Sequence, residues 1–463
     1  MSGTASRTVA DGLAQLRQAV DDDLGGRLDR IVARADDPPT IAVAGRVSAG
    51  KSTLVNALVG RRVAPTDAGE CTQVVARFRY GRDERVVVHR HDGSEVRVPF
   101  DDQGRIPSSL GVPVQTVDHL EVLLSNRRLR DVELVDTPGV SSSSAASGRS
   151  EAFLAFDAAS RDEVARADAV VYLLTHTGRS DEAADLAAFG AGAGGRSDAA
   201  VGVLGKADLV ASGDPAAAAD LAERLEAQLR GHVHEVIPVW TLVAESVSCG
   251  RFGESDAATA AAVAGLDATD RELMLLAESL FVEEEVPVDR YARAHLQDIL
   301  GHAGAVRVVE MAGSGVLGAA RLTAGLDDLS GRSRLDGAIS GLARRADALR
   351  AARMLTDAEK LGFDDWVRGA SIRDQVERLR ALPALHVLDE TTARGDVLTG
   401  RARLSVGLGD EALAILDDPS SVVDLDAAID RWRSEEALCA DPLGGRVART
   451  VTRTLSLRRQ GLR

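Results

Sequence analysis

The feature that most restricts how this chain can fold is the segment at residues 45–52, which reads GRVSAGKS. It directly follows an apolar run at residues 41–44 and precedes a helix-forming stretch at residues 53–59. A glycine-rich turn between a strand and a helix, ending in lysine and serine, is typical of a loop that binds phosphate groups. The alternative is a chance glycine-rich turn, which the strand, the helix and the residue identities together disfavour.

This loop predicts separate tasks for its residues. Glycines let backbone amides approach phosphates, and the helix that starts after Gly50 favours an anion at its amino terminus. Lys51 is expected to neutralise the β- and γ-phosphate oxygens, and the Ser52 hydroxyl to ligate Mg²⁺. The predicted nucleotide-binding residues of the loop are Gly45, Ser48, Ala49, Gly50, Lys51, Ser52 and Thr53.

Between residue 40 and about residue 245, short β-rich runs alternate with helical runs. We expect strands at residues 41–44, 75–80, 132–135, 169–174, 201–204 and 236–239. We expect helices at residues 53–59, 151–166, 181–189 and 215–229. Continuous apolar strands separated by helices predict an α/β domain, with a mostly parallel sheet and helices on both faces. Residues 86–88 and 96–98, joined across Asp92-Gly93, predict a hairpin.

After about residue 250 the β-rich pattern nearly ends, and long helical segments replace it. They are expected at residues 271–284, 289–312, 336–361, 372–379 and 422–438. Near the amino terminus, apolar residues from Val9 to Ile31 recur three or four positions apart, which predicts one amphipathic helix that needs partners. We therefore expect an N-terminal helix joining a helical neck (1–38), an α/β domain (39–250) and an all-helical neck and trunk bundle (251–463).

Two further segments follow expected strands of the α/β domain. Residues 134–139 read LVDTPG, where Asp136 can hold the metal through water and the amide of Gly139 can meet a γ-phosphate. Residues 201–208 read VGVLGKAD, where the Asp208 carboxylate can accept two hydrogen bonds from a guanine edge. Adenine offers no matching pair of donors, so Asp208 predicts selection of GTP, with the stem of Lys206 packed along the base.

The segment from residue 63 to residue 73, VAPTDAGECTQ, has the composition of a switch loop. Thr72 is the residue expected to reach Mg²⁺ and the γ-phosphate, because it directly precedes the next strand. Thr66 is the second choice, and a plain surface loop is the alternative. Residues 139–144 start a second loop that fits a mobile switch.

Overall composition narrows the partners and the compartment. The net charge of −16 and the isoelectric point near 5.1 argue against general binding of nucleic acid. Three widely spaced cysteines fit neither a disulfide framework nor a zinc site and indicate a reducing cytoplasm. We see no signal peptide and no apolar run of the roughly 18 residues that a spanning helix needs, so we expect a cytoplasmic protein with at most peripheral membrane contact.

Two segments could make such a contact. The C-terminal run from Arg446 to Arg463 contains arginines and no acid, and either lies on anionic lipid as a basic amphipathic helix or is a solvated helix whose arginines pair with the acidic bundle. The Gly- and Ala-rich residues 306–324 are the second candidate, for which close helix packing is the alternative. Trp240, after the last strand, either flanks the nucleotide or lies in the core.

The motifs GRVSAGKSTLVNALVG, APTDAGECTQVVARFRYG, VDTPG and GKAD together resemble the bacterial dynamin-like proteins, in particular the actinobacterial isoniazid-inducible dynamin-like GTPases. The resemblance covers about residues 1–250 and is weaker beyond. It implies a GTPase domain on a helical neck and trunk, pairing of GTPase domains with a second copy or a paralogous partner, and contact of the far end of the trunk with an anionic membrane at the inner face of the plasma membrane. The residues that match the family pattern by position are Lys51, Ser52, Thr72, Asp136, Gly139, Lys206 and Asp208.

One position departs from that pattern. In the wider dynamin family a polar residue at the position of Val47 positions the attacking water, and valine cannot do so. Ser48 could contact phosphate or a charge-compensating cation in a dimer, or could be a packed loop hydroxyl. We therefore expect catalysis to involve Lys51, Ser48, Thr72 and Gly139, with Ser52, Thr72 and Asp136 at the metal and slow basal hydrolysis of GTP.

The function that these expectations favour is a GTPase that couples domain pairing to movement of its helical trunk, for remodelling or maintenance of a membrane. The alternative is a GTP-gated scaffold that docks a partner protein with little hydrolysis. A ribosome-associated GTPase would need a basic surface, which the acidic charge disfavours.

Overall fold

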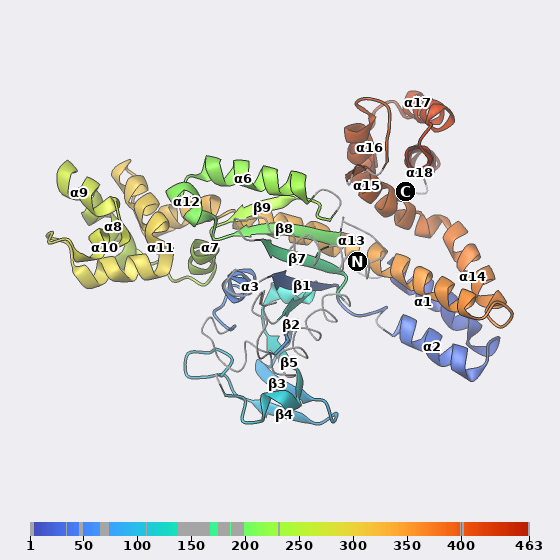
Figure 1. Cartoon of the computed structure of the whole chain (residues 1–463), viewed down its shortest axis with the longest axis horizontal. Coiled ribbons are helices and arrows are strands. Elements are labelled where there is room, and N and C mark those ends of the chain that lie inside the picture. The colour runs from blue at the N-terminus through green and yellow to red at the C-terminus, as the bar shows by residue number, and fades with distance from the viewer. Residues whose placement is uncertain are drawn as a thin grey trace, which may run out of the picture.

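A nine-stranded sheet lies between helical regions at both ends of the molecule (Figure 1). The computed structural model describes residues 4–33, 35–45, 50–64, 74–107, 109–137, 167–174, 186, 199–229, 232–398, 400 and 402–461. The strands are β1 (Thr40–Gly45), β2 (Ala76–Tyr80), β3 (Arg85–Arg90), β4 (Glu95–Val98), β5 (Val117–Leu124), β6 (Glu133–Asp136), β7 (Ala169–Leu174), β8 (Ala200–Gly205) and β9 (Val236–Val239). Their order in the sheet is β4-β3-β5-β2-β6-β1-β7-β8-β9.

Five neighbouring strands, β6, β1, β7, β8 and β9, run parallel, so their carboxyl ends share one edge of the sheet. Strand β2 pairs antiparallel with β6 and parallel with β5, which places the carboxyl ends of β2 and β5 at the opposite edge. The expected hairpin is confirmed, since β3 and β4 pair antiparallel. All six expected strands are present, each within one or two residues of its expected ends.

The strand β5 is missing from our sequence-based prediction. It pairs with both β2 and β3 and so links the hairpin to the rest of the sheet. Its apolar residues, Val117, Leu120, Val122 and Leu124, are buried, whereas Asp118 is exposed and His119 and Glu121 are half-buried. A strand with one polar face has no continuous apolar run, which is the pattern that identified the other strands.

Helices cover both faces of the parallel part of the sheet, which confirms the expected α/β class. On one face, helix α3 (Lys51–Val59) and Leu335 of a long helix pack against β1, β7 and β8. On the other face, α6 (Pro215–Gln228) packs against β9 and contributes Ala218 and Leu225 to a second core cluster. The expected helices at residues 151–166 and 181–189 lie outside the described part of the chain, apart from Leu186.

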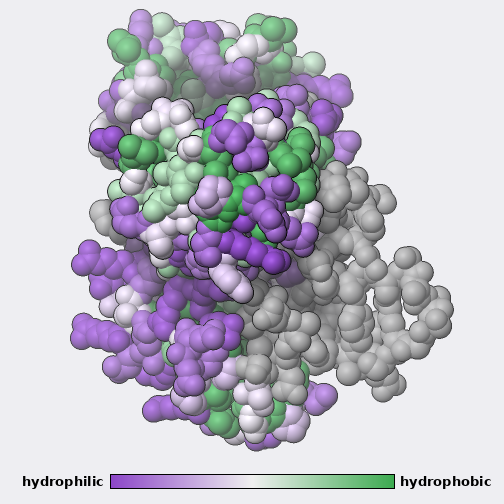
Figure 2. Space-filling view, turned by 90° about the vertical axis from the view of Figure 1, so that its left-hand side faces the viewer, coloured by the Kyte–Doolittle hydropathy of each residue, from purple (hydrophilic) through white to green (hydrophobic). Residues whose placement is uncertain are grey.

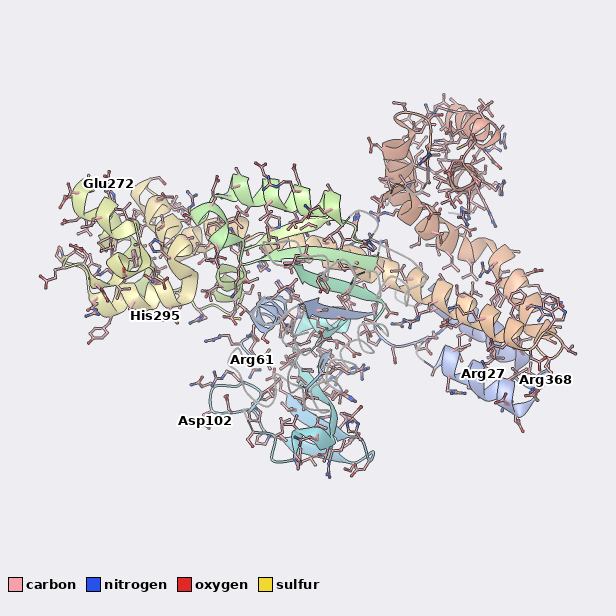
Figure 3. The ribbon with its side chains drawn as sticks, viewed as in Figure 1. Arg27, Arg61, Asp102, Glu272, His295 and Arg368 are labelled. Carbon is pink, nitrogen blue, oxygen red and sulfur yellow. The ribbon has the colours of Figure 1, made fainter. Side chains whose placement is uncertain are left out.

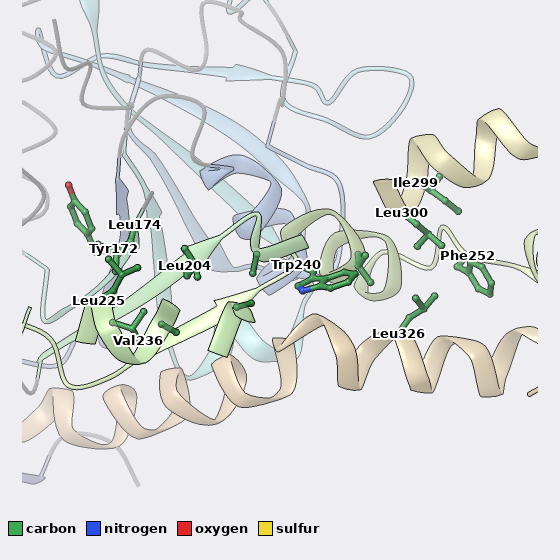
Figure 4. Close-up of a cluster of buried hydrophobic side chains, with 14 of the residues drawn as sticks. Tyr172, Leu174, Leu204, Leu225, Val236, Trp240, Phe252, Ile299, Leu300 and Leu326 are labelled. Carbon is green, nitrogen blue, oxygen red and sulfur yellow. The ribbon is translucent and has the colours of Figure 1, made fainter. Parts of the chain in front are cut away.

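The second core cluster continues beyond the sheet into the helices that follow residue 250. Trp240 lies between the sheet and the helices that carry Leu300 and Leu326 (Figure 4). Trp240 is only 2% exposed, so of our two alternatives for it the structure supports the core residue. One apolar core therefore joins the sheet to the neighbouring helical region.

The described chain after β9 is helical, as expected. Its helices are α7 (Thr241–Ser248), α8 (Glu254–Ala264), α9 (Ala268–Leu275), α10 (Glu278–Glu283), α11 (Arg290–Gly313), α12 (Ala319–Ser330), α13 (Arg332–Asp364), α14 (Ala370–Ala381), α15 (His386–Leu398), α16 (Leu408–Asp417), α17 (Leu425–Leu438) and α18 (Pro442–Arg459). Our single helix at residues 271–284 is wrong, because Ala277 takes an extended conformation between α9 and α10. Arg293 then donates to the carbonyls of Phe281 and Glu284 and so satisfies the end of α10.

Helix α11 is interrupted within its length. Gly301 has φ +70° and ψ 172°, a conformation that favours glycine, so the expected continuous helix at residues 289–312 bends there. A Cβ atom at this position would lie 3.7 Å from both Asp208 Oδ2 and Leu242 Cδ2. The bend therefore lies directly against the loop that follows β8.

The single N-terminal helix expected at residues 9–31 is also wrong. The chain forms α1 (Thr4–Ala14), a short 3₁₀ turn, and then α2 (Asp22–Val32). The Asp21 side chain accepts a hydrogen bond from the Leu24 amide and starts α2 there. The apolar spacing continues across this break because α1 packs on α13 and α14 and α2 packs on α13, with Leu13, Leu24 and Leu361 in one cluster.

Helix α13 passes the amino ends of the parallel strands, and Arg350 fixes it there. Arg350 donates to Asp168, which precedes β7, and to the carbonyls of Asp37 and Pro38, which precede β1. The side chains of Arg350 and Asp168 are only 8% and 6% exposed. Asp168 also accepts from the Thr40 amide at 2.9 Å. This buried cluster connects α13 to the start of the two central strands β1 and β7.

The C-terminal arginines are mostly used within the protein. On α18, Arg449 pairs with Glu436 at 2.7 Å, Arg459 pairs with Asp426 at 2.8 Å, and Arg453 lies 3.8 Å from Asp389. Arg458 donates to the carbonyl of Val422 at 2.8 Å. Of our two alternatives for this segment, the helix whose arginines pair with the acidic bundle is confirmed.

The other membrane candidate, residues 306–324, is split between α11 and α12, and Val308, Val309, Ala312 and Leu322 are buried in the core. This supports close helix packing. Seen from this end of the molecule, the surface mixes hydrophobic and hydrophilic residues without a continuous hydrophobic face (Figure 2). No helix in the described part of the chain has the length and apolar character needed to cross a membrane.

Candidate nucleotide-binding site

Two glycines make the turn between β1 and α3 possible. Gly45 has φ +140°, and a Cβ atom there would lie 2.7 Å from the Leu173 carbonyl oxygen on β7. Gly50 has φ +92°, and a Cβ atom there would lie 3.2 Å from Thr241 Oγ1 at the start of α7. A side chain would be strained at either position, so the sequence places glycine where the backbone must turn closely.

Lys51 and Ser52 form the first turn of α3, as expected. The Lys51 side chain is buried, which lowers its pKa, while the nearby Asp136 carboxylate opposes that shift. The α3 amino terminus carries unpaired amides that favour an anion. Thr53, the next residue, is half-buried in the same turn. This arrangement suits a phosphate-binding turn with a cation beside it.

Asp136 ends β6 next to this turn. Its Oδ2 accepts a hydrogen bond from Ser52 Oγ at 3.4 Å, and Thr137 fastens the strand end by donating from Oγ1 to the Val43 carbonyl at 3.0 Å. Burial raises the Asp136 pKa to about 6, although Lys51 and the Ser52 hydrogen bond act in the opposite direction. The other oxygen, Asp136 Oδ1, is buried without a hydrogen-bond partner among the described residues.

A hard cation would satisfy that oxygen. Mg²⁺ prefers oxygen ligands, and Ser52 Oγ and the Asp136 carboxylate are the two oxygen groups that the structure brings together here. A bound cation would also lower the pKa of Asp136 and favour its charged form. The residues therefore fit a magnesium site that a phosphate group would complete.

The loop after β8 lies at the same edge of the sheet. Because β8 pairs with β7 and β7 with β1, Gly205 lies two strands from Gly45, which is about 10 Å at the usual strand spacing. Lys206 has φ +54° and is exposed, and Asp208 is half-buried with its pKa raised by burial. An acceptor at this distance from a phosphate loop suits the base of a nucleotide.

This base-side loop rests on the helical region. Gly213 at its end has φ +82°, and a Cβ atom there would lie 2.7 Å from Ala303 Cβ and 3.2 Å from Trp240 Cη2. Arg307 of α11 donates to the Gly213 carbonyl at 3.0 Å. Together with the close approach of Asp208 to Gly301, these contacts connect the expected guanine site to α11.

Several predicted site residues lie outside the described part of the chain. They are Val47, Ser48 and Ala49 of the phosphate loop, Thr66 and Thr72 of the first switch loop, and Gly139 of the second. The structure brings Gly45, Gly50, Lys51, Ser52 and Asp136 together at the carboxyl edge of the parallel strands, with Lys206 and Asp208 two strands away.

A buried pair that our sequence analysis did not identify supports this edge. Asn56 on α3 donates to Glu245 Oε1 on α7 at 2.8 Å and to the Ala64 carbonyl at 3.1 Å, and its Oδ1 accepts from the amides of Val63 and Ala64. Both side chains are 1% exposed. The pair holds Val63 and Ala64, where the predicted switch loop begins, against α3 and α7. The available signal was a polar residue, Asn56, inside the apolar stretch LVNALV.

The use of lysine and arginine along the sequence is a second signal for the candidate site. The chain contains only three lysines among its 55 basic residues, and two of them are Lys51 and Lys206. Arginine and lysine are not equivalent, because an ammonium group is a compact point charge and a guanidinium group is a planar fork. Two of the three lysines in this arginine-rich chain therefore lie at positions where the sequence predicts contact with a nucleotide.

Comparison with known proteins agrees with this geometry. Residues 41–177 match the model of the Dynamin family. The isoniazid-induced protein IniC from two Mycobacterium tuberculosis strains, CDC 1551 and H37Rv, is 32% identical over 471 residues, which span 92% of this chain and 91% of the relative. A bacterial dynamin-like protein of Nostoc punctiforme is 42% identical over 53 residues, 11% of this chain and 8% of that protein.

Solved structures show a weaker likeness. Two structures of an oligomerised bacterial dynamin pair, described as a mechanism for long-range sensing and tethering of membranes, share 13% sequence identity with this chain. They cover 98% and 99% of this chain and 75% of their own chains, with TM-scores of 0.34 and 0.36. Scores in this range support no conclusion about function.

Proposed function

The chain belongs to the bacterial dynamin-like proteins, and from this premise we propose that it binds GTP with Mg²⁺ at the carboxyl edge of its parallel strands and hydrolyses it slowly. The observation that carries the proposal is the group formed by Lys51, Ser52 and Asp136, in which Asp136 Oδ1 is buried and lacks a partner among the described residues. A buried carboxylate that destabilises the free protein is typical of a site that a ligand completes.

Each residue of this group has a proposed task. The Lys51 ammonium group neutralises charge that develops on the β- and γ-phosphate oxygens, and the Ser52 hydroxyl and Asp136 hold the cation. Mg²⁺ would supply charge stabilisation across the phosphates. Asp208 accepts the guanine donors, and its partial burial makes this hydrogen bonding more selective than it would be in water.

We propose that a second copy completes the catalytic site. Val47 has no polar atom that could orient the attacking water, so backbone, a switch loop with Thr72 or Gly139, or the partner subunit must do so. Pairing of the α/β domains would then accelerate hydrolysis, and the contacts of Asp208 and Gly213 with α11 would transmit the change to the helical neck and trunk. The three-part division at residues 38 and 250 remains a prediction within this proposal.

A phosphate-release assay with GTP tests the activity. Lys51→Ala should lower turnover at least about 100-fold, because it removes the main cation at the phosphates. Lys360→Ala is a matched control, since Lys360 is 71% exposed on α13, far along the chain from the site. The turnover per molecule of the unaltered protein should rise with protein concentration. Equal turnover in the Lys51 variant and the unaltered protein would refute the proposal.

We further propose that the turn between α13 and α14 contacts an anionic membrane, at the inner face of the plasma membrane. Three large apolar side chains are exposed there: Phe363 at 53%, Trp366 at 66% and Val367 at 82%. The turn lies at one end of the molecule beside α2, where Arg27 pairs with Asp364 and Arg368 pairs with Asp21 (Figure 3). Tryptophan with arginine beside it is typical of a membrane interface.

The turn is held rigid, which lowers the cost of inserting it. Arg373 lies 4.0 Å from the centre of the Trp366 ring and donates to the Trp366 carbonyl at 2.7 Å. Asp365 accepts from the amides of Val367 and Arg368 and closes the turn. The side chains of Trp366 and Val367 are thereby presented outward with little freedom to lose.

Tryptophan fluorescence provides a direct test of this surface. The other two tryptophans, Trp240 and Trp432, are 2% and 0% exposed, so a blue shift on adding phosphatidylglycerol vesicles would report Trp366. Trp366→Phe should abolish the shift, and Val367→Asp should reduce co-sedimentation with the vesicles. Leu438→Asp, at an 82% exposed site on α17, is the matched control and should bind as the unaltered protein does. Membrane binding that Val367→Asp leaves unchanged would refute this surface.

A further inference from the structure

A hollow of about 730 Å³ opens at the sheet edge opposite the nucleotide site. It lies at the carboxyl ends of β2 and β5, next to the β2–β3 turn, a short 3₁₀ helix at residues 127–130 and Pro38. Ligands of open α/β sheets bind beyond the carboxyl ends of strands, at a point where strand direction or order changes. Because β2 runs antiparallel to β6, this sheet has such a point at its second edge.

Arginines dominate the lining of the hollow, although the chain as a whole has a net charge of −16. They come from four different elements, and Arg85, Leu123 and Arg79 lie side by side in register across β3, β5 and β2. The lining arginines are Arg79, Arg82, Arg85 and Arg130. Such convergence of cations from separate elements indicates a built surface rather than a run of charges in the sequence.

Two of the three acids that line the hollow already pair with arginines. Glu133 pairs with Arg77 at 2.9 Å and with Arg79 at 3.2 Å. Glu121 pairs with Arg79 at 3.2 Å. The remaining lining acid, Asp83, is exposed on the β2–β3 turn.

Three arginines are left to face the hollow with little compensation. Arg130 donates to the Tyr80 hydroxyl at 3.0 Å and stacks over its ring, and it lowers the pKa of Tyr80 together with Arg82. Arg85 forms no hydrogen bond or ion pair with any residue that the structure describes, and its Nε atom is buried. A buried guanidinium nitrogen without a partner is costly unless an anion occupies the site.

We propose that this hollow binds a phosphate group, through Arg82, Arg85 and Arg130, with the Tyr80 hydroxyl as a further polar contact. Arginine forks match the oxygens of a phosphate, and each hydrogen bond between two charged groups is about twice as strong as a neutral one. The source is either a free polyphosphate or the headgroup of an anionic phospholipid. The proposal does not depend on GTP turnover, because no residue of the nucleotide site takes part.

Titration calorimetry with inorganic pyrophosphate tests the site. The double variant Arg82→Ala, Arg85→Ala should bind at least about tenfold more weakly than the unaltered protein, because it loses charge-assisted hydrogen bonds. Arg97→Ala is the matched control, since Arg97 is exposed on the neighbouring strand β4 outside the hollow. The nucleotide site contributes equally to all three proteins, so the difference isolates the hollow. Equal affinities would overturn the proposal.

Two further measurements exclude misfolding and identify the source. Arg85→Lys keeps the charge and loses the fork, so its affinity should lie between those of the unaltered protein and the double variant. Co-sedimentation with phosphatidylcholine vesicles, with and without phosphatidylglycerol, separates the sources. Loss of binding in the double variant, with competition by pyrophosphate, indicates a lipid headgroup. A pyrophosphate site without any change in sedimentation indicates a free phosphate compound.

Discussion

The two edges of the parallel strands are built in opposite ways. At the carboxyl edge, Gly45 and Gly50 have positive φ angles, and Asp136 keeps a buried oxygen without a partner among the described residues. At the amino edge, Arg350 pairs with Asp168 and also saturates two carbonyls. One edge is therefore closed by buried ion pairing, whereas the other keeps an unsatisfied carboxylate oxygen, as expected of the proposed ligand site.

The largest effect that this comparison predicts is on stability at the amino edge. Arg350→Ala leaves Asp168 buried and unpaired, so we expect a loss of about 3–5 kcal/mol in the free energy of unfolding, measured by urea denaturation. Nucleotide affinity per folded molecule should stay within about twofold, because the carboxyl edge is untouched. A stability loss below about 1 kcal/mol would contradict the view that the amino edge is strongly stabilised by buried ion pairing.

The next effect has the opposite sign and lies at the carboxyl edge. Burial raises the Asp136 pKa to about 6 from an ordinary value of 3.8, so the folded state binds a proton more tightly than the unfolded state does. The free energy of unfolding therefore falls as the pH rises from about 4 to about 6, and the whole cost is present above pH 6. Asp136→Asn should stabilise the ligand-free protein by about 3 kcal/mol at pH 8 and hardly at pH 3.5.

The same variant should fail in function. Without the carboxylate, addition of GTP and Mg²⁺ should raise the melting temperature of the unaltered protein and leave that of Asp136→Asn nearly unchanged. Thermal denaturation of both proteins, with and without ligand and at both pH values, measures these eight melting temperatures. Destabilisation of the free protein by Asp136→Asn at pH 8 would contradict the view that this edge stores unpaired charge.

The smallest predicted loss of stability comes from a second, exposed ion pair at the amino edge. Arg334 also connects α13 to the start of a strand, since it pairs with Glu235 before β9 at 3.0 Å. Its side chain is 60% exposed, so Arg334→Ala should cost no more than about 0.5 kcal/mol. Urea denaturation beside the Arg350 variant tests whether burial, and not the mere presence of an ion pair, makes this edge strong.

The parts of this fold that sequence could predict are those with local signals. Strands such as residues 41–44 and 169–174 are buried on both faces and read as continuous apolar runs. Strand β5 escapes that rule because its polar face carries His119 and Glu121. The break at Asp21 is hidden because the apolar spacing continues on both sides of it.

In the candidate site too, the residues with local sequence signals could be predicted and the long-range contacts could not. Lys51, Ser52 and Asp136 follow from local motifs, and the structure brings them together. Their roles, with those of Thr72, Gly139 and Ser48 outside the described residues, stay predictions. Glu245 lies 189 residues from Asn56, and Asp168 lies 182 residues from Arg350, so no local pattern could connect them. Such contacts depend on which strands become neighbours, which propensity and spacing do not encode.

The bend at Gly301 divides α11 directly beside Asp208, the residue proposed to bind guanine, and would act as a pivot for the second half of the helix if the proposed nucleotide moved it. The segment from residue 302 to residue 313 is about 18 Å long at the usual helical rise, so a rotation of about 10° at the pivot moves its far end by about 3 Å. Glycine permits such a rotation without side-chain strain, and Asp208 and Gly213 lie against it. A small rotation at the base of the nucleotide would therefore move the far end of the helix by about the diameter of a methyl group.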